Sequence, residues 1–104
     1  MYRYTTPTLP ITIDDIDFSE VRTFRIAIKQ KSDKEPLLFI VPADDERVDA
    51  QNKTINLALT QEQTAALKAG YARVQVRIVY QSGSVQATPE APITIKDVFD
   101  EVIV

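Results

Sequence analysis

The stretch between residues 57 and 83 constrains the fold more than any other part of the chain. It reads LALTQEQTAALKAGYARVQVRIVYQSG, and apolar and polar residues alternate in it from Tyr71 to Tyr80. A period of two over ten residues indicates a β-strand, because successive side chains of a strand point to opposite faces. The residues expected to face a core are Ala72, Val74, Val76, Ile78 and Tyr80.

A short helix is predicted just before this strand, at about residues 61–69. Thr60 can accept hydrogen bonds from first-turn amides, and Gln63, three residues on, completes a capping box. Gly70 is suited to end the helix in a left-handed conformation. So short a helix is marginal in water and must dock on other elements. Its expected buried contacts are Ala66 and Leu67.

Further strands are predicted from short alternating or apolar segments. They are Leu9 to Ile13, Val21 to Lys31, Leu37 to Val41, Ile55 to Leu59, Val85 to Thr88, and Ile93 to Ile95. Pro10 cannot donate a ladder hydrogen bond, which places the first strand at a sheet edge. The continuous apolar run of Leu37 to Val41 is typical of a strand buried on both faces. A polar hairpin loop is expected at residues 32–36.

This pattern predicts one domain spanning residues 1–104. Six or seven short strands with one small helix favour a mainly β fold, an antiparallel β-sandwich with an immunoglobulin-like layout. The residues expected in its core are Ile11, Phe24, Ile26, Ile28, Leu38, Phe39, Ile40, Ile55, Leu57, Leu59, Leu67, Val74, Val76, Ile78 and Ile95.

The amino-acid composition argues against several classes of function. The chain has 104 residues, a formal charge of −3, no histidine, no cysteine and two glycines. The negative charge disfavours nucleic acid and anionic membranes as partners, and the longest apolar run is far too short to span a bilayer. Histidine- and cysteine-based catalysis, the usual zinc and haem ligand sets, and glycine-rich nucleotide loops are excluded. We therefore expect a protein that is not an enzyme and binds no cofactor.

Two acidic clusters are the candidates for a metal site. One holds Asp14, Asp15 and Asp17; the other holds Asp44, Asp45, Glu46 and Asp49. Carboxylates at such spacing could hold calcium, but the spacing matches no EF-hand loop and no glycine supplies the sharp turn. We interpret both clusters as solvated turn residues and expect no metal.

Two groups of side chains in the chain could bind a partner. The polar residues of the long strand, Arg73, Gln75 and Arg77, could bind an anionic partner, or form a solvent face paired with Glu20 or Glu62. The tyrosines could form a sugar-binding surface; they are Tyr2, Tyr4, Tyr71 and Tyr80.

The two ends of the chain are the other candidate surfaces. At the start lies an arm of Tyr2, Arg3 and Tyr4. The segment from Val98 to Val104 contains Phe99, Val102 and Ile103 and is more apolar than a free end should be. Either it completes the domain's own sheet, which is the default expectation, or it adds a strand to a neighbouring molecule.

Several short segments carry a resemblance. They are Thr5-Thr6-Pro7-Thr8, Leu59 to Thr64, Val74-Gln75-Val76-Arg77, Gly83, and Val98 to Ile103. In these the chain resembles small proteins encoded in phages and prophages of Gram-positive bacteria, near virion structural genes. At Ala87-Thr88-Pro89 it departs from the pattern, which has a small residue followed by serine.

The resemblance implies a phage structural or assembly component located in the virion, or in the host cytoplasm during assembly. It carries no catalytic residues. The leading hypothesis is a non-enzymatic protein that contacts other phage structural proteins or itself, so that an oligomer is possible. One alternative is an immunoglobulin-like module that binds a glycan or protein ligand. Another is a carboxylate-based hydrolase, which would need two carboxylates in a deep cleft.

Overall fold

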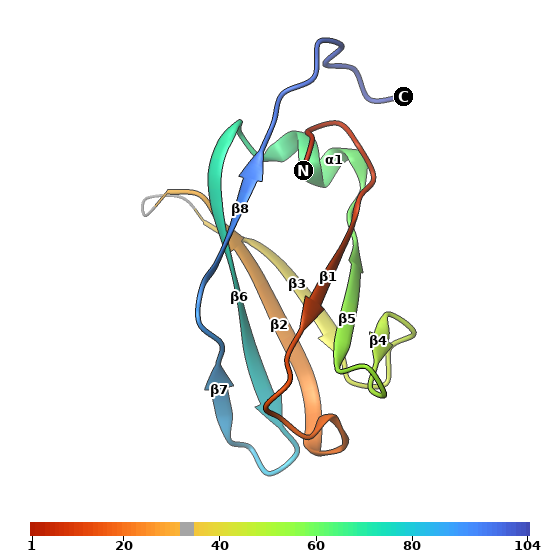
Figure 1. Ribbon diagram of the computed structural model, residues 1–104, viewed down its shortest axis with the longest axis vertical. Coiled ribbons are helices and arrows are strands. Elements are labelled where there is room, and N and C mark those ends of the chain that lie inside the picture. Colours follow the sequence, from red (N-terminus) through yellow and green to blue (C-terminus); the bar gives the residue numbers. More distant parts are fainter. Residues whose placement is uncertain (32–34) are drawn as a thin grey trace.

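The computed structural model describes residues 1–31 and 35–104, and it is mainly β with two antiparallel sheets and one short α-helix (Figure 1). The loop expected at residues 32–36 thus lies partly outside the described residues. The small sheet has the order β1–β5–β4, with β1 at Thr8–Thr12, β4 at Val48–Asp49 and β5 at Thr54–Ala58.

The large sheet has the order β3–β2–β6, and both β7 and β8 pair with the remaining edge of β6. Its strands are β2 (Val21–Lys29), β3 (Leu37–Pro42), β6 (Gly70–Tyr80), β7 (Val85–Ala87) and β8 (Ala91–Ile95). The described chain crosses between the sheets after β1, after β3 and through the helix that follows β5. The first strand is an edge strand, as the proline at its centre predicts.

The core lies between the two sheets. On β2 and β6 the alternation predicted from the sequence is confirmed, because every second side chain is buried. The small sheet contributes Ile55 and Leu57, which are fully buried. Two antiparallel sheets with their apolar faces turned toward one core are consistent with a β-sandwich.

The helix α1 (Gln61–Ala66) closes one end of the molecule and connects β5 to β6 (Figure 1). Its capping box is confirmed: the Thr60 hydroxyl accepts from the Gln63 amide, and the Gln63 side chain accepts from the Thr60 amide. The helix is shorter than expected. Leu67 is buried, but Ala66 is exposed and Thr64 is buried in its place. Gly70 does not end the helix, since it is the first residue of β6 with φ +125°.

The prediction that β3 is buried on both faces is wrong. Phe39 and Val41 enter the core, whereas Leu38 is 44% exposed and Ile40 is 55% exposed. The reason is that the small sheet covers only one face of the large sheet, so β3, like β2 and β6, turns its other face to solvent. The outer face carries no second layer within the described residues.

Candidate interaction surfaces

The C-terminal tail, residues 97–104, lies outside both sheets. It forms no strand, so it does not complete the domain's own sheet, contrary to the default expectation. It passes above α1 in Figure 1. Phe99 is fully exposed. The other exposed large hydrophobic residues of the tail are Val102, Ile103 and Val104.

Three polar contacts hold the tail to its own chain. The Arg3 guanidinium donates to Asp97 at 2.8 Å and lies 3.5 Å from Glu101. The Gln61 side chain pairs with the backbone of Val104, donating at 2.7 Å and accepting at 2.9 Å. All these contacts are polar and lie at the molecular surface, so none of them covers the apolar side chains of the tail.

Arg3 of the N-terminal arm is occupied within its own chain. Its guanidinium also donates to the carbonyl oxygens of Leu67 and Ala65, at the end of α1. The hydrogen bond to Asp97 is the main cause that raises the pKa of Arg3. Tyr2 pairs with Lys96 as an isolated bridge. The structure therefore uses this arm to join α1, the end of β8 and the tail, and its role as a surface for a partner stays a prediction.

The polar stripe on β6 is on the outer face of the large sheet, as predicted. Arg73 pairs with Glu90 at 3.1 Å, rather than with either acidic residue suggested by the sequence. The Gln75 amide donates to the carbonyl of Thr88 at 2.9 Å. Arg77 forms no ion pair within residues 1–31 and 35–104.

Most of this outer face is formed by residues that the sequence pattern does not single out. The strand pairing places Arg25 beside both Ile40 and Arg77, and it places Ala27 beside Leu38. Val85 of β7 lies on the same face, because it is paired with Val79 of β6. The run at residues 37–41 gave no signal for this face, because every residue in it is apolar and so shows no period of two.

The acidic residues stabilise turns. Asp17 caps the short 3₁₀ helix η1 (Phe18–Glu20) by accepting from the amide and hydroxyl of Ser19, and these hydrogen bonds lower its pKa. Two hydrogen bonds from the Arg47 guanidinium, each 2.9 Å, lower the pKa of Asp45 to about 2. Asp49 accepts from Asn52. In the described part of the chain no three acidic residues are grouped so that they could hold a metal ion.

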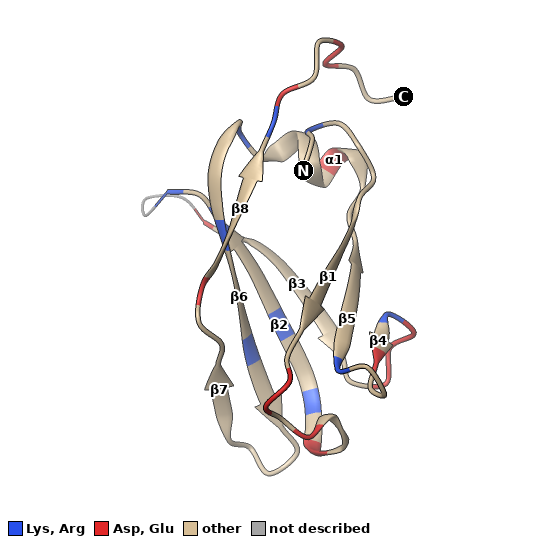
Figure 2. Ribbon diagram, in the orientation of Figure 1, with Lys and Arg blue, Asp and Glu red and all other residues tan. Residues whose placement is uncertain are grey.

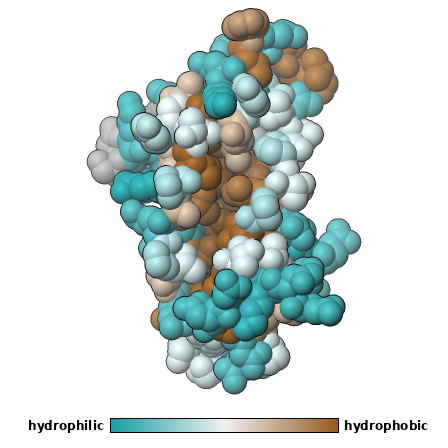
Figure 3. Space-filling view, in the orientation of Figure 1, coloured by the Kyte–Doolittle hydropathy of each residue, from teal (hydrophilic) through white to brown (hydrophobic). Residues whose placement is uncertain are grey.

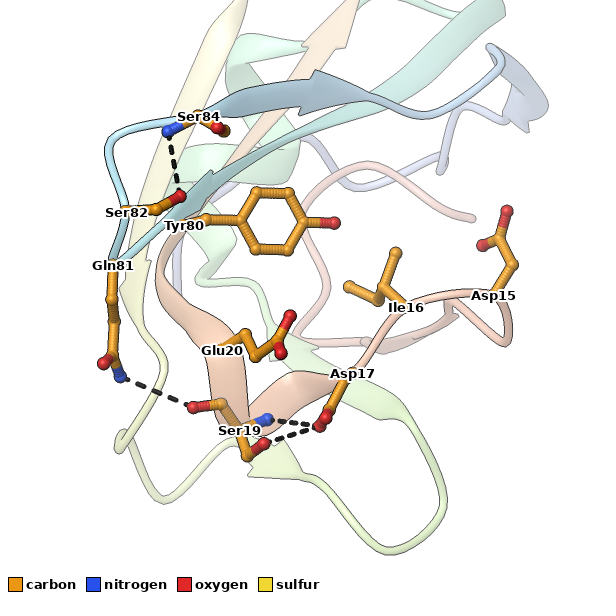
Figure 4. Close-up of a pocket in the computed structure, with 9 residues that line it drawn as sticks. All are labelled: Asp15, Ile16, Asp17, Ser19, Glu20, Tyr80, Gln81, Ser82 and Ser84. Atoms are coloured by element: carbon orange, nitrogen blue, oxygen red, sulfur yellow. Dashed lines mark hydrogen bonds between the residues drawn. The ribbon is translucent and has the colours of Figure 1, made fainter.

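A polar hollow of about 640 Å³ lies between the η1 turn and the β6–β7 hairpin (Figure 4). Glu20 and Tyr80 both line it, together with Asp17 at its edge. A catalytic acid must hold a proton near neutral pH, and the lowered pKa of Asp17 keeps this carboxylate ionised. An ionised Asp17 is suited to the role of a base rather than of an acid, and the lining holds two further carboxyl groups, those of Asp15 and Glu20.

An apolar groove of about 540 Å³ runs along the free edge of β1. Leu9 and Ile11 form one wall, Ile93 of β8 lies on the other, and Val74 and Val76 line it from β6. Figure 3 shows apolar side chains gathered in a hollow on this side of the molecule. The charged residues among its lining are Asp14 and Asp15, so the groove is apolar with an acidic end.

The exposed aromatic rings of the described chain lie in three different segments and make no ring–ring contact with one another. Tyr2 is in the arm, Tyr71 is on the outer face of the large sheet, and Phe99 is in the tail. Among the described residues the ring–ring contact is that of Phe18 with Phe24, inside the core.

None of the helices in residues 1–31 and 35–104 has the length and apolar character that crossing a membrane requires. Comparisons of the chain with protein-family models, with curated proteins and with solved structures find no match.

Proposed function

We propose that this chain is a non-enzymatic structural or assembly component of a phage or prophage particle, acting through protein–protein contacts on an immunoglobulin-like sandwich. The observation that carries the proposal is the exposed apolar tail. Phe99 and Val104 are almost entirely in solvent, and Val102 and Ile103 are also exposed. A contiguous exposed apolar segment is typical of a contact site with another protein.

The tail suits this role because the fold does not need it. No residue of the tail belongs to the buried core, and the large sheet is complete at Ile95. A segment of this kind can bind a partner without unfolding the domain. The resemblance of several short segments to phage and prophage proteins supports the proposal that this contact is made in a phage particle.

The contact is tested with tail variants of the full chain. Phe99→Asp with Ile103→Asp places two charges in the apolar tail, and Ala50→Asp with Gln51→Glu adds two charges in an exposed loop as the matched control. We expect light scattering to show an average mass that rises with concentration for the parent and the control. The tail variant should remain at the mass of one chain with an unchanged melting temperature.

A parent that stays monomeric at all concentrations, with the tail variant behaving identically, would contradict self-association through the tail. The particle setting is tested separately, by quantifying the chain in purified particles from cells that carry its gene. The chain should be present at a fixed ratio to the major structural protein. Its recovery in the soluble cell fraction alone would contradict a structural role.

A further inference from the structure

The outer face of the large sheet is both basic and apolar. Its residues alternate with the buried ones along β2, β3 and β6, and the strand pairing aligns them in rows. One row runs through Ile40, Arg25, Arg77 and Ala87, and the next contains Leu38, Ala27 and Gln75. The charged residues within β2 and β6 are all Lys or Arg, as the blue segments in Figure 2 show.

Like charges lie directly opposite each other on this face. Arg25 is opposite Arg77, and Lys29 is opposite Arg73. Cross-strand neighbours have Cβ atoms about 4.5–5.5 Å apart, and like charges at this separation destabilise the sheet. Of the four, only Arg73 has an ion pair within the described part of the chain. The isolated molecule therefore leaves this face electrostatically unsatisfied.

The tail has the complementary character. It holds Asp97, Asp100 and Glu101 and no basic residue. The described chain leaves nine large hydrophobic residues exposed, and eight of them lie on these two surfaces. On the outer face they are Leu38, Ile40, Tyr71 and Val85; in the tail they are Phe99, Val102, Ile103 and Val104.

The groove beside β1 fits the tail less well. Its lining contains Asp14 and Asp15 and no Lys or Arg, so it would repel a segment that carries three carboxylates. The outer face offers cations at the same place as exposed apolar side chains. Charge therefore selects the outer face over the groove.

We infer that the tail of one copy docks on the outer face of the large sheet of a second copy, a contact that rests on the proposed role of the tail. Asp100 and Glu101 would meet Arg25 and Arg77, and Glu101 would give up its 3.5 Å contact with Arg3 to do so, while Phe99 and its apolar neighbours cover Ile40. The tail does not dock on the large sheet of its own copy, because it passes over α1 toward the side of β1 and β5, away from that sheet (Figure 1). Two copies that exchange tails reciprocally form a closed dimer, and copies that do not reciprocate form chains or rings.

A reciprocal charge swap tests the inference. The face swap is Arg25→Glu with Arg77→Glu, and the tail swap is Asp100→Arg with Glu101→Arg. Each swap alone places like charges across the contact, and we expect association at least about tenfold weaker by light scattering. Mixing the two variants should restore association, because each tail then meets a face of opposite charge. One chain with both swaps keeps the parent's net charge and should associate like the parent, which controls for folding.

The outcomes separate this inference from the proposed function. Association that is lost on changing the tail but kept in the face swap would overturn the outer face as the docking site and leave the role of the tail intact. Absence of association in the parent would overturn the inference, while the presence of the chain in purified particles would still support the proposed function.

A disulfide test distinguishes two copies from one. The chain has no cysteine, so Ile40→Cys with Val102→Cys introduces the only thiols. Oxidation with copper–phenanthroline should give covalent dimers and longer species on a non-reducing gel, as the inferred contact requires. A cross-linked monomer alone would show docking on the chain's own face and would overturn the inference.

Discussion

Replacing Ile26 or Ile40 with alanine removes the same atoms from opposite faces of one sheet. Ile26 on β2 is fully buried between the sheets, whereas Ile40 on the neighbouring β3 is 55% exposed. The pair therefore compares a side chain in the core with one on the outer face. It tests directly whether the outer face lacks a covering layer in the single molecule.

The expected effects differ in size. Truncating a fully buried isoleucine costs about 2–5 kcal/mol, because the lost transfer free energy adds to that of the cavity. At Ile40 solvent already reaches more than half of the side chain and no closed cavity forms. We expect a loss of about 1 kcal/mol or less there, from partial burial and lower strand propensity.

The assay is equilibrium urea unfolding at a protein concentration where light scattering shows a single chain. The free energy of unfolding should fall by at least about 2 kcal/mol for Ile26→Ala. Equal losses at the two positions would refute the reasoning, because they would mean that the outer face is buried within the monomer. A negligible loss at Ile26 would refute the strand pairing itself.

Four further predictions concern the core, the helix cap and the acidic loop. Val76→Asp buries an unpaired charge and should unfold the domain by circular dichroism, whereas Gln75→Asp on the exposed face of the same strand should leave it folded. Thr60→Ala removes the capping box and should lower the free energy of unfolding by about 1 kcal/mol in urea melts. The pKa of Asp45 is about 2 in the folded chain against an ordinary 3.8, so its contribution to stability is present above pH 3.8 and is lost as the pH falls through 2. Acid titration followed by fluorescence or circular dichroism should show a smaller loss over this range for Asp45→Asn than for the parent; an identical loss would contradict the Arg47 pairing as its cause. Calorimetric calcium titration of the parent should give no saturable isotherm tighter than millimolar, and a micromolar isotherm abolished by Asp45→Asn would show a metal site in this loop.

The alternating strands and the helix cap were predictable because their signals are local. The period of two on β2 and β6 depends only on the geometry of an extended backbone, and the Thr60–Gln63 cap depends on residues three apart. The length of α1 was less predictable. The helix ends at the buried Leu67. Arg3, which is distant in the sequence, donates hydrogen bonds from its guanidinium to the carbonyl oxygens of Ala65 and Leu67.

The sequence by itself determined that the chain is mainly β, that β1 with its proline lies at an edge, and which face of β6 enters the core. Tertiary structure alone decided that Leu38 and Ile40 face solvent and that Arg25 lies opposite Arg77. The physical reason is that a uniformly apolar strand has no preferred face until it pairs, and its exposure depends on which sheet covers it. The fate of the tail was decided in the same way, because its apolar residues suit a sheet but its described contacts are polar ones to Arg3 and Gln61.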